Sequence, residues 1–76
     1  MRVVWGADVE RRLRLMPARD EAAIRTAVHR FAGGADIHPA DGSLRRRLRV
    51  GRHYVVMVLE PDGGAVWVVR LYRAER

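Results

Sequence analysis

The stretch that decides the fold is SLRRRLRVGRHYVVMVLEPDGGAVWVVRLYR, residues 43–73. Its three apolar segments are separated by Gly51-Arg52 and by Pro61–Gly64, and PDGG is a strong hairpin signal. The middle segment is an almost unbroken apolar run, as expected for a central strand covered on both faces. The pattern therefore predicts three consecutive strands, at Leu44–Val50, His53–Glu60 and Ala65–Arg73.

Arginine and apolar residues alternate in the first of these strands. Leucine or valine at positions 44, 48 and 50 alternates with Arg45, Arg47 and Arg49. Because successive side chains of a strand point to opposite faces, these three arginines are predicted to share one face of the sheet. The same rule places His53 and Tyr54 on opposite faces, so both cannot serve one site.

The first half of the chain predicts one strand and two helices. The short β-branched segment before Gly6 favours a strand, and acidic residues near the start of each later segment favour a helix N-terminus. Ile24, Ala27, Val28 and Phe31 form the predicted buried stripe of the second helix. The elements are expected at Arg2–Trp5, Ala7–Met16 and residues 18–34, followed by a loop at residues 35–43.

Together these segments predict one α+β domain spanning residues 1–76, in the order β-α-α-β-β-β. A helical hairpin would pack on one face of a small, twisted, mainly antiparallel sheet, and the arginines would occupy the other face. Trp5 and Trp67 are expected in the core, since a tryptophan in mid-strand is usually buried. His29 is expected on the surface of the second helix.

The charge of the chain is high and unevenly distributed. All fifteen basic residues are arginine, and the formal net charge is +6. Residues 1–42 hold seven arginines and six acids, whereas residues 43–76 hold eight arginines and three acids. A polyanionic partner, nucleic acid or an acidic protein, would suit this distribution, and a solvated arginine face without a partner is the alternative.

The composition also bears on metals and membranes. The chain has no cysteine, and its three histidines are not at metal-ligand spacing, so we expect no metal site. No apolar run approaches the roughly 20 residues that span a bilayer. The first residues become charged too early for a signal peptide, so we expect a cytoplasmic protein without a membrane association.

Three motifs resemble the RelE/ParE superfamily of toxins from type II toxin–antitoxin systems. These are the hexapeptide LRVGRH, the final strand VWVVRLYR, and the upstream text MPARDEAAIRTAVHRFA, which is similar to the second helix of the family's hairpin. The resemblance covers nearly the whole chain. It implies the family's fold, in which a short strand and a helical hairpin precede a C-terminal antiparallel sheet.

The resemblance also implies a function. The expected activity is a metal-independent and cofactor-independent mRNA endonuclease that acts on the ribosome and is neutralised by a cognate antitoxin. Tyr54 and Ala74 stand where the ribonucleases of the family carry basic residues, and VGRH is closer to the ParE branch. A DNA gyrase inhibitor and an inactive remnant that only binds an antitoxin are therefore the alternatives.

RNA cleavage of this kind requires stabilisation of phosphate charge and transfer of protons. Guanidinium groups bind phosphate bidentately and stay charged, but they are poor bases. Proton transfer would therefore fall to His53, with the tyrosines as alternatives. The predicted site residues are Arg49, His53 and Arg73 for catalysis, Arg45, Arg47 and Arg52 for phosphate or RNA binding, and Tyr54 and Tyr72 for stacking or proton transfer.

Overall fold

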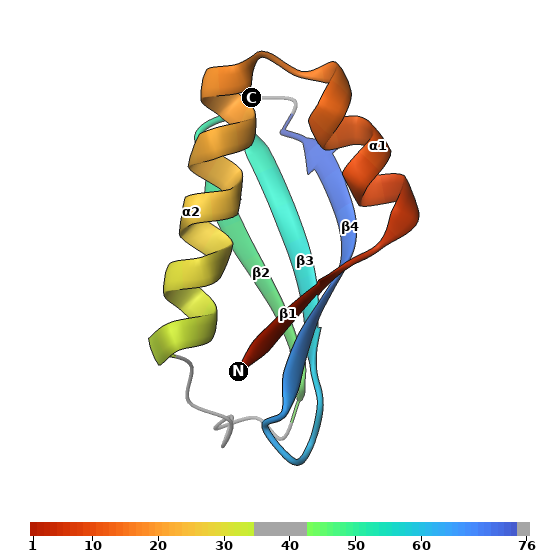
Figure 1. Ribbon diagram of the computed structural model, residues 1–76, viewed down its shortest axis with the longest axis vertical. Coiled ribbons are helices and arrows are strands. Elements are labelled where there is room, and N and C mark those ends of the chain that lie inside the picture. Colours follow the sequence, from red (N-terminus) through yellow and green to blue (C-terminus); the bar gives the residue numbers. More distant parts are fainter. Residues whose placement is uncertain (35–42, 75–76) are drawn as a thin grey trace.

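The computed structural model describes residues 1–34 and 43–74, and its elements follow the predicted order (Figure 1). Every predicted boundary lies within one residue of the observed one. Of the predicted loop, residues 35–42 lie outside the described part of the chain. The elements are β1 (Arg2–Trp5), α1 (Ala7–Leu15), α2 (Ala18–Gly34), β2 (Arg45–Val50), β3 (His53–Leu59) and β4 (Ala65–Arg73).

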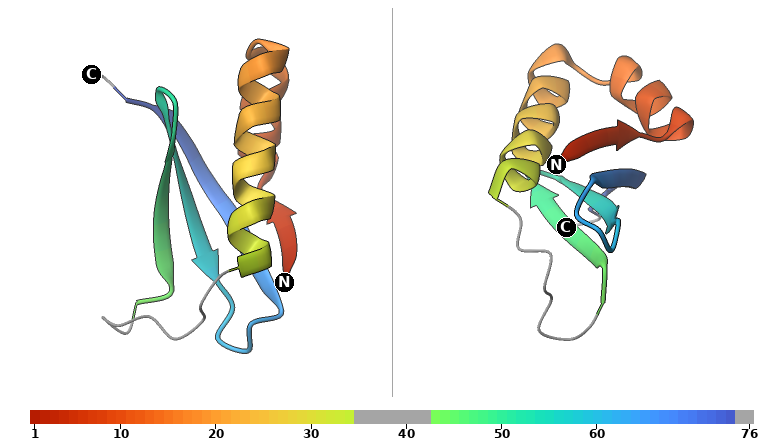
Figure 2. Two further views of the ribbon diagram at one scale, coloured as in Figure 1. Left: turned by 90° about the vertical axis from the view of Figure 1, so that its left-hand side faces the viewer. Right: turned by 60° about the horizontal axis from the view of Figure 1, so that its bottom comes forward.

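The fold is α+β, with both helices on one face of a four-stranded mixed sheet of order β1-β4-β3-β2 (Figure 2). The β2–β3 and β3–β4 pairs are antiparallel, whereas β1 runs parallel to β4. This arrangement leaves the opposite face of the sheet, here called the open face, without a helix over it in the described residues. Strand β3 is consequently covered by helices on one side only. On the open face Val56 is buried but Val58 is 38% exposed, so the expected cover on both faces holds only in part.

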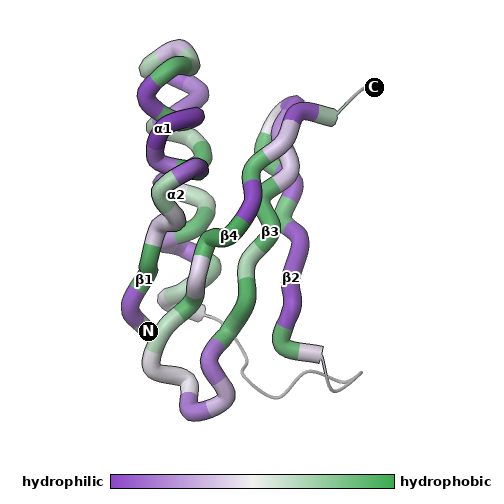
Figure 3. Tube along the Cα trace, turned by 90° about the vertical axis from the view of Figure 1, so that its right-hand side faces the viewer, coloured by the Kyte–Doolittle hydropathy of each residue, from purple (hydrophilic) through white to green (hydrophobic). Residues whose placement is uncertain are grey.

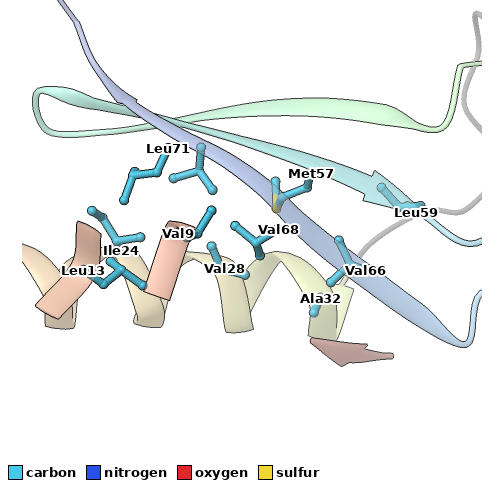
Figure 4. Close-up of a cluster of buried hydrophobic side chains, with 11 residues drawn as sticks. Val9, Leu13, Ile24, Val28, Ala32, Met57, Leu59, Val66, Val68 and Leu71 are labelled. Atoms are coloured by element: carbon cyan, nitrogen blue, oxygen red, sulfur yellow. The ribbon is translucent and has the colours of Figure 1, made fainter. Parts of the chain in front are cut away.

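A single apolar core fills the space between the helices and the sheet (Figure 4). Helix α2 contributes Ile24, Val28 and Ala32, spaced four residues apart on one side of the helix. Ala27 and Phe31, which were predicted for this stripe, are only half-buried. The remaining buried members are Val9 and Leu13 from α1, and Val55, Met57, Leu59, Val66, Val68 and Leu71 from the sheet.

One side chain fastens both helices to strand β1. The Arg25 guanidinium donates to both carboxylate oxygens of Glu10 at 2.7 and 3.2 Å, and to Glu21 at 2.9 and 3.0 Å. It also lies over the ring of Trp5, 5.0 Å from the ring centroid. Trp5 packs against the core as predicted, and His29 lies on the exposed surface of α2 with its ring against the edge of Trp5.

A β-bulge in β4 alters which side chains reach the open face. Val56 pairs with Arg70, but the next residue, Met57, pairs with Val68, so Val69 has no partner on β3. Val69 is therefore 50% exposed although it follows the buried Val68. An extra residue of this kind bends the strand and increases its twist locally.

Trp67 is not a core residue, contrary to the prediction. It pairs with Val58 on the open face and is 43% exposed. Its indole Nε1 donates a hydrogen bond of 3.0 Å to Glu60 Oε1. Trp67 is not buried because it lies between two residues that point towards the helices, so its own side chain points to the opposite face.

Candidate nucleic-acid interface

The open face carries a continuous set of side chains, all of them arginine or aromatic except for two valines. The registers of the two antiparallel pairs align the arginines of β2 with alternate residues of β3 and β4. In Figure 3, β2 is coloured largely as hydrophilic and forms one edge of the sheet. The members of this set are Arg45, Arg47, Arg49, Tyr54, Val56, Val58, Trp67, Arg70 and Tyr72.

Two stacked tyrosines form the centre of this face. Tyr54 and Tyr72 are cross-strand partners, with ring centroids 5.4 Å apart and ring planes inclined by 28°. Arg47 and Arg49 lie over the Tyr54 ring at 4.7 and 5.1 Å, and Arg70 lies over the Tyr72 ring at 5.3 Å. Each guanidinium is thus attracted to the negative face of a ring, which holds three like charges close together.

Arg49 is also held by hydrogen bonds. Its Nε donates to the Gly51 carbonyl oxygen at 2.9 Å, and its Nη1 donates to the Tyr54 hydroxyl oxygen at 3.1 Å. Gly51 has φ of +58°, the left-handed conformation that the tight β2–β3 turn requires. The turn predicted at Gly51-Arg52 therefore also orients the arginine that precedes it.

The open face is positively charged and exposed. Within residues 1–34 and 43–74, Arg45, Arg47 and Arg70 form no ion pair with a carboxylate. Glu60, the acidic residue directly after β3, is hydrogen-bonded to Trp67 on this face. Guanidinium groups beside stacked aromatic rings can bind a phosphate backbone and the faces of unpaired bases.

The structure divides the predicted site between the two sides of the sheet. Arg45, Arg47, Arg49, Tyr54 and Tyr72 lie together on the open face. His53 shares the strand parity of the core residue Val55, and pairs with Arg73 at the end of the β3–β4 ladder. Arg52, His53 and Arg73 line a cleft on the helical side of the sheet, so His53 and Arg73 do not join Arg49 in one catalytic site.

This division changes which groups can transfer protons on the open face. His53 is absent from it, and the hydroxyl groups of Tyr54 and Tyr72 are the remaining candidates. The Tyr54 oxygen accepts a hydrogen bond from Arg49, which leaves the tyrosine's own hydroxyl proton available to another acceptor. Sequence reasoning also missed Arg70, although alternation along β4 from Tyr72 would have placed it on this face. Trp67 was expected in the core, and it shares a face with Tyr72 only because of the bulge.

The described residues offer no cluster of three histidine, cysteine, aspartate or glutamate side chains that could hold a metal ion. Neither α1 nor α2 has both the length and the apolar character of a membrane-crossing helix. Comparison of the chain with protein-family models, with curated proteins and with solved structures found no match.

Proposed function

We propose that this chain is a toxin of the RelE/ParE type that binds RNA across the open face and cleaves translated mRNA without a metal ion. The observation that carries the proposal is the packing of Arg47, Arg49 and Arg70 on the stacked pair Tyr54 and Tyr72. A cytoplasmic location, the ribosome as the site of action and a cognate antitoxin as the inhibitor belong to the same proposal.

The arrangement of the chain supports this choice of family. A short N-terminal strand, a helical hairpin and three C-terminal antiparallel strands follow in the order that the resemblance implies. The motif LRVGRH supplies the end of β2 and its turn, and VWVVRLYR supplies β4. Two of the three motifs that carry the resemblance thus contribute to the face that carries the proposed activity.

The proposed reaction begins with attack of a ribose 2′-hydroxyl on the adjacent phosphate. The phosphorane-like transition state gains negative charge, which Arg47 and Arg49 stabilise by charge-assisted hydrogen bonds. The 2′-hydroxyl loses its proton to water as the 2′-oxygen bonds to phosphorus and the bond between phosphorus and the 5′-oxygen breaks. The Tyr54 hydroxyl donates its proton to the departing 5′-oxygen, and the neighbouring Arg49 stabilises the phenolate, which then regains a proton from water. The products are a 2′,3′-cyclic phosphate and a free 5′-hydroxyl end.

One observation favours a second candidate. Because His53 and Arg73 lie on the other side of the sheet, the open face lacks the histidine that was expected to transfer protons. A charged aromatic face without that histidine would suit a gyrase inhibitor, which binds a protein and need not cleave RNA. An antitoxin-binding remnant of the fold would use the same face and would not stop growth.

The proposal is tested by induced expression in a bacterium with mapping of RNA 5′ ends. We expect new ends within translated codons for the original chain, and roughly a hundredfold fewer for Arg49→Gln and Tyr54→Phe. Arg30→Gln, an equal charge change on the exposed surface of α2, is the control and should cleave normally.

Three outcomes would contradict the proposal. Growth arrest with intact mRNA would support the gyrase inhibitor, and normal growth would support the remnant. Cleavage that requires His53 but not Tyr54 would place proton transfer on the helical side of the sheet.

RNA binding itself can be measured with the purified protein and a short single-stranded RNA. If the four guanidiniums of Arg45, Arg47, Arg49 and Arg70 each neutralise one phosphate, the logarithm of affinity should fall against the logarithm of salt with a slope of about −3. Arg47→Gln should reduce the slope by about 0.7, whereas Arg11→Gln on α1 should not change it. An equal reduction in both variants would indicate a diffuse electrostatic attraction and contradict a defined interface.

A further inference from the structure

A second positively charged site lies on the other side of the sheet. A cleft of about 630 Å³ opens between the start of α2, the β2–β3 turn and the end of β4, and is here called the end cleft. In Figure 2 the sheet and α2 diverge towards this end of the molecule. The volume falls within the usual range of small-molecule sites, roughly 300–1,000 Å³.

Three guanidinium groups from separate elements line the end cleft. Arg19 comes from α2, Arg52 from the turn and Arg73 from β4, and all three residues are exposed. None of their side chains forms a hydrogen bond or an ion pair with another described residue. Their donors are therefore free to bind an anion, and guanidinium favours the geometry of phosphate.

The rest of the lining suits the nucleoside part of a ligand. Met16, Pro17 and Val50 supply apolar surface, and the imidazole of His53 supplies an aromatic face on which a base can stack. Asp20 is the single acid among the lining residues, and its carboxylate forms no hydrogen bond or ion pair with another residue that the structure describes. A carboxylate beside a phosphate site is a good acceptor for the hydroxyl groups of a ribose, and it would repel a second acidic group.

We propose that the end cleft binds a ribonucleoside 5′-monophosphate, free or as the phosphorylated end of an RNA. The phosphate lies on Arg52 and Arg73, the ribose hydroxyls bond to Asp20, and the base packs against Met16 and His53. This site goes beyond the proposed activity of the open face, from which the thickness of the sheet separates it. It also gives a role to His53 and Arg73, which lie outside the open face and take no part in the reaction proposed there.

The test is calorimetric titration of the purified chain with 5′-AMP at constant salt. We expect saturable binding at one site, with inorganic phosphate and adenosine each binding roughly tenfold more weakly, because each lacks part of the contact. Arg52→Gln and Arg73→Gln should each weaken 5′-AMP binding about tenfold. Asp20→Asn should weaken 5′-AMP more than 2′,3′-dideoxy-AMP, which has no ribose hydroxyl to bond to it.

Arg30→Gln is the matched control, since it removes one exposed arginine of α2 that does not line the cleft. An equal loss in Arg30→Gln would show nonspecific attraction, and a loss in Arg47→Gln as large as in Arg73→Gln would place the nucleotide on the open face. Tighter binding of an acidic peptide than of 5′-AMP would also overturn the proposal. Tighter binding of a 5′-phosphorylated trinucleotide than of 5′-AMP would support the site and assign it to an RNA end.

The two proposals can fail separately. Loss of RNA cleavage in Arg49→Gln tests only the open face, and loss of nucleotide binding in Arg73→Gln tests only the end cleft. A chain that binds 5′-AMP through Arg52 and Arg73 but leaves mRNA intact would keep the second proposal and overturn the first.

Discussion

At the scale of single residues, Arg25 makes the most consequential contacts described for this chain. It bonds to Glu10 of α1 and Glu21 of α2, and it stacks on Trp5 of β1. The bidentate geometry with Glu10 and the partial burial of all three charged side chains make this network stronger than an ordinary surface ion pair. Arg14 approaches the same Glu10 at 3.7 Å, but its side chain is 76% exposed.

This contrast predicts different effects for the same substitution at two positions. Arg25→Gln should lower the free energy of unfolding by about 1–3 kcal/mol, because it leaves two carboxylates without their donor. Arg14→Gln should lower it by less than about 0.5 kcal/mol. Urea denaturation followed by circular dichroism measures both, and equal losses would show that Arg25 is no more than a surface charge.

The pKa of Glu10 gives the pH dependence of the same network. The hydrogen bond from Arg25 is the main cause that lowers the pKa of this carboxyl in the folded chain, opposed by burial and assisted by the charges of Arg25 and Arg14. A lowered pKa means that the ionised carboxyl stabilises the folded state above its unfolded pKa of about 4.3. This stability is lost as the pH falls through the lower, folded-state pKa.

Glu10→Gln should therefore flatten the fall in unfolding free energy below about pH 4.3, and should be less stable than the original chain at neutral pH. Urea denaturation of the two chains between about pH 2 and 7 checks this. Parallel pH profiles for the two chains would show that Glu10 has an ordinary pKa.

At the scale of secondary structure elements, most of the fold was predictable. The bounds of β1 and β4 were predicted correctly to the residue, because glycine, proline and apolar alternation mark them clearly. The bulge at Val69 was not predicted, since nothing in VWVVRLYR distinguishes an extra residue from regular alternation. That bulge places Trp67 on the same face as Arg70 and Tyr72, whereas regular alternation would place Trp67 on the opposite face.

Alanine substitutions at two glycines, one in the β2–β3 turn and one near the end of α2, should change stability in opposite directions. Gly51→Ala should destabilise the chain by about 1 kcal/mol, because φ of +58° is unfavourable for a residue with a Cβ atom even though open space surrounds it. Gly33→Ala, in the helical conformation near the end of α2 with nothing close to its Cβ position, should stabilise it by about 0.5 kcal/mol. Thermal unfolding would measure opposite shifts in Tm, and shifts of the same sign would contradict this account of the turn.

At the scale of the whole molecule, two features could not be predicted from the sequence. These are the order of the strands in the sheet and the separation of the predicted site residues between the open face and the cleft. Local patterns do not show that β1 lies parallel beside β4, since that pairing joins the two ends of the chain. Strand parity did place His53 opposite Tyr54, but it could not show that α2, the β2–β3 turn and the end of β4 enclose a cleft beside His53. Such contacts between distant segments depend on helix packing, which a single sequence does not reveal.

The small single core predicts a strong dependence on individual side chains. Leu13 is fully buried, whereas Leu15, two residues later on the same helix, is 82% exposed. Leu13→Ala should cost about 2–5 kcal/mol, a large part of the stability of so short a chain, and Leu15→Ala less than about 0.5 kcal/mol. Urea denaturation compares the two, and similar losses would mean that α1 does not pack as described.

The sheet order has a consequence for self-association. Among the described strands β2 has a neighbour on one side only, so its outer backbone groups could pair with the same strand of another molecule. Its row of arginines opposes such pairing, because two copies would bring six or more like charges together. A polyanion that neutralises these arginines would remove the repulsion. The chain should therefore be most prone to aggregate at sub-stoichiometric amounts of RNA, when a molecule whose arginines are neutralised can meet another whose β2 edge is still uncovered.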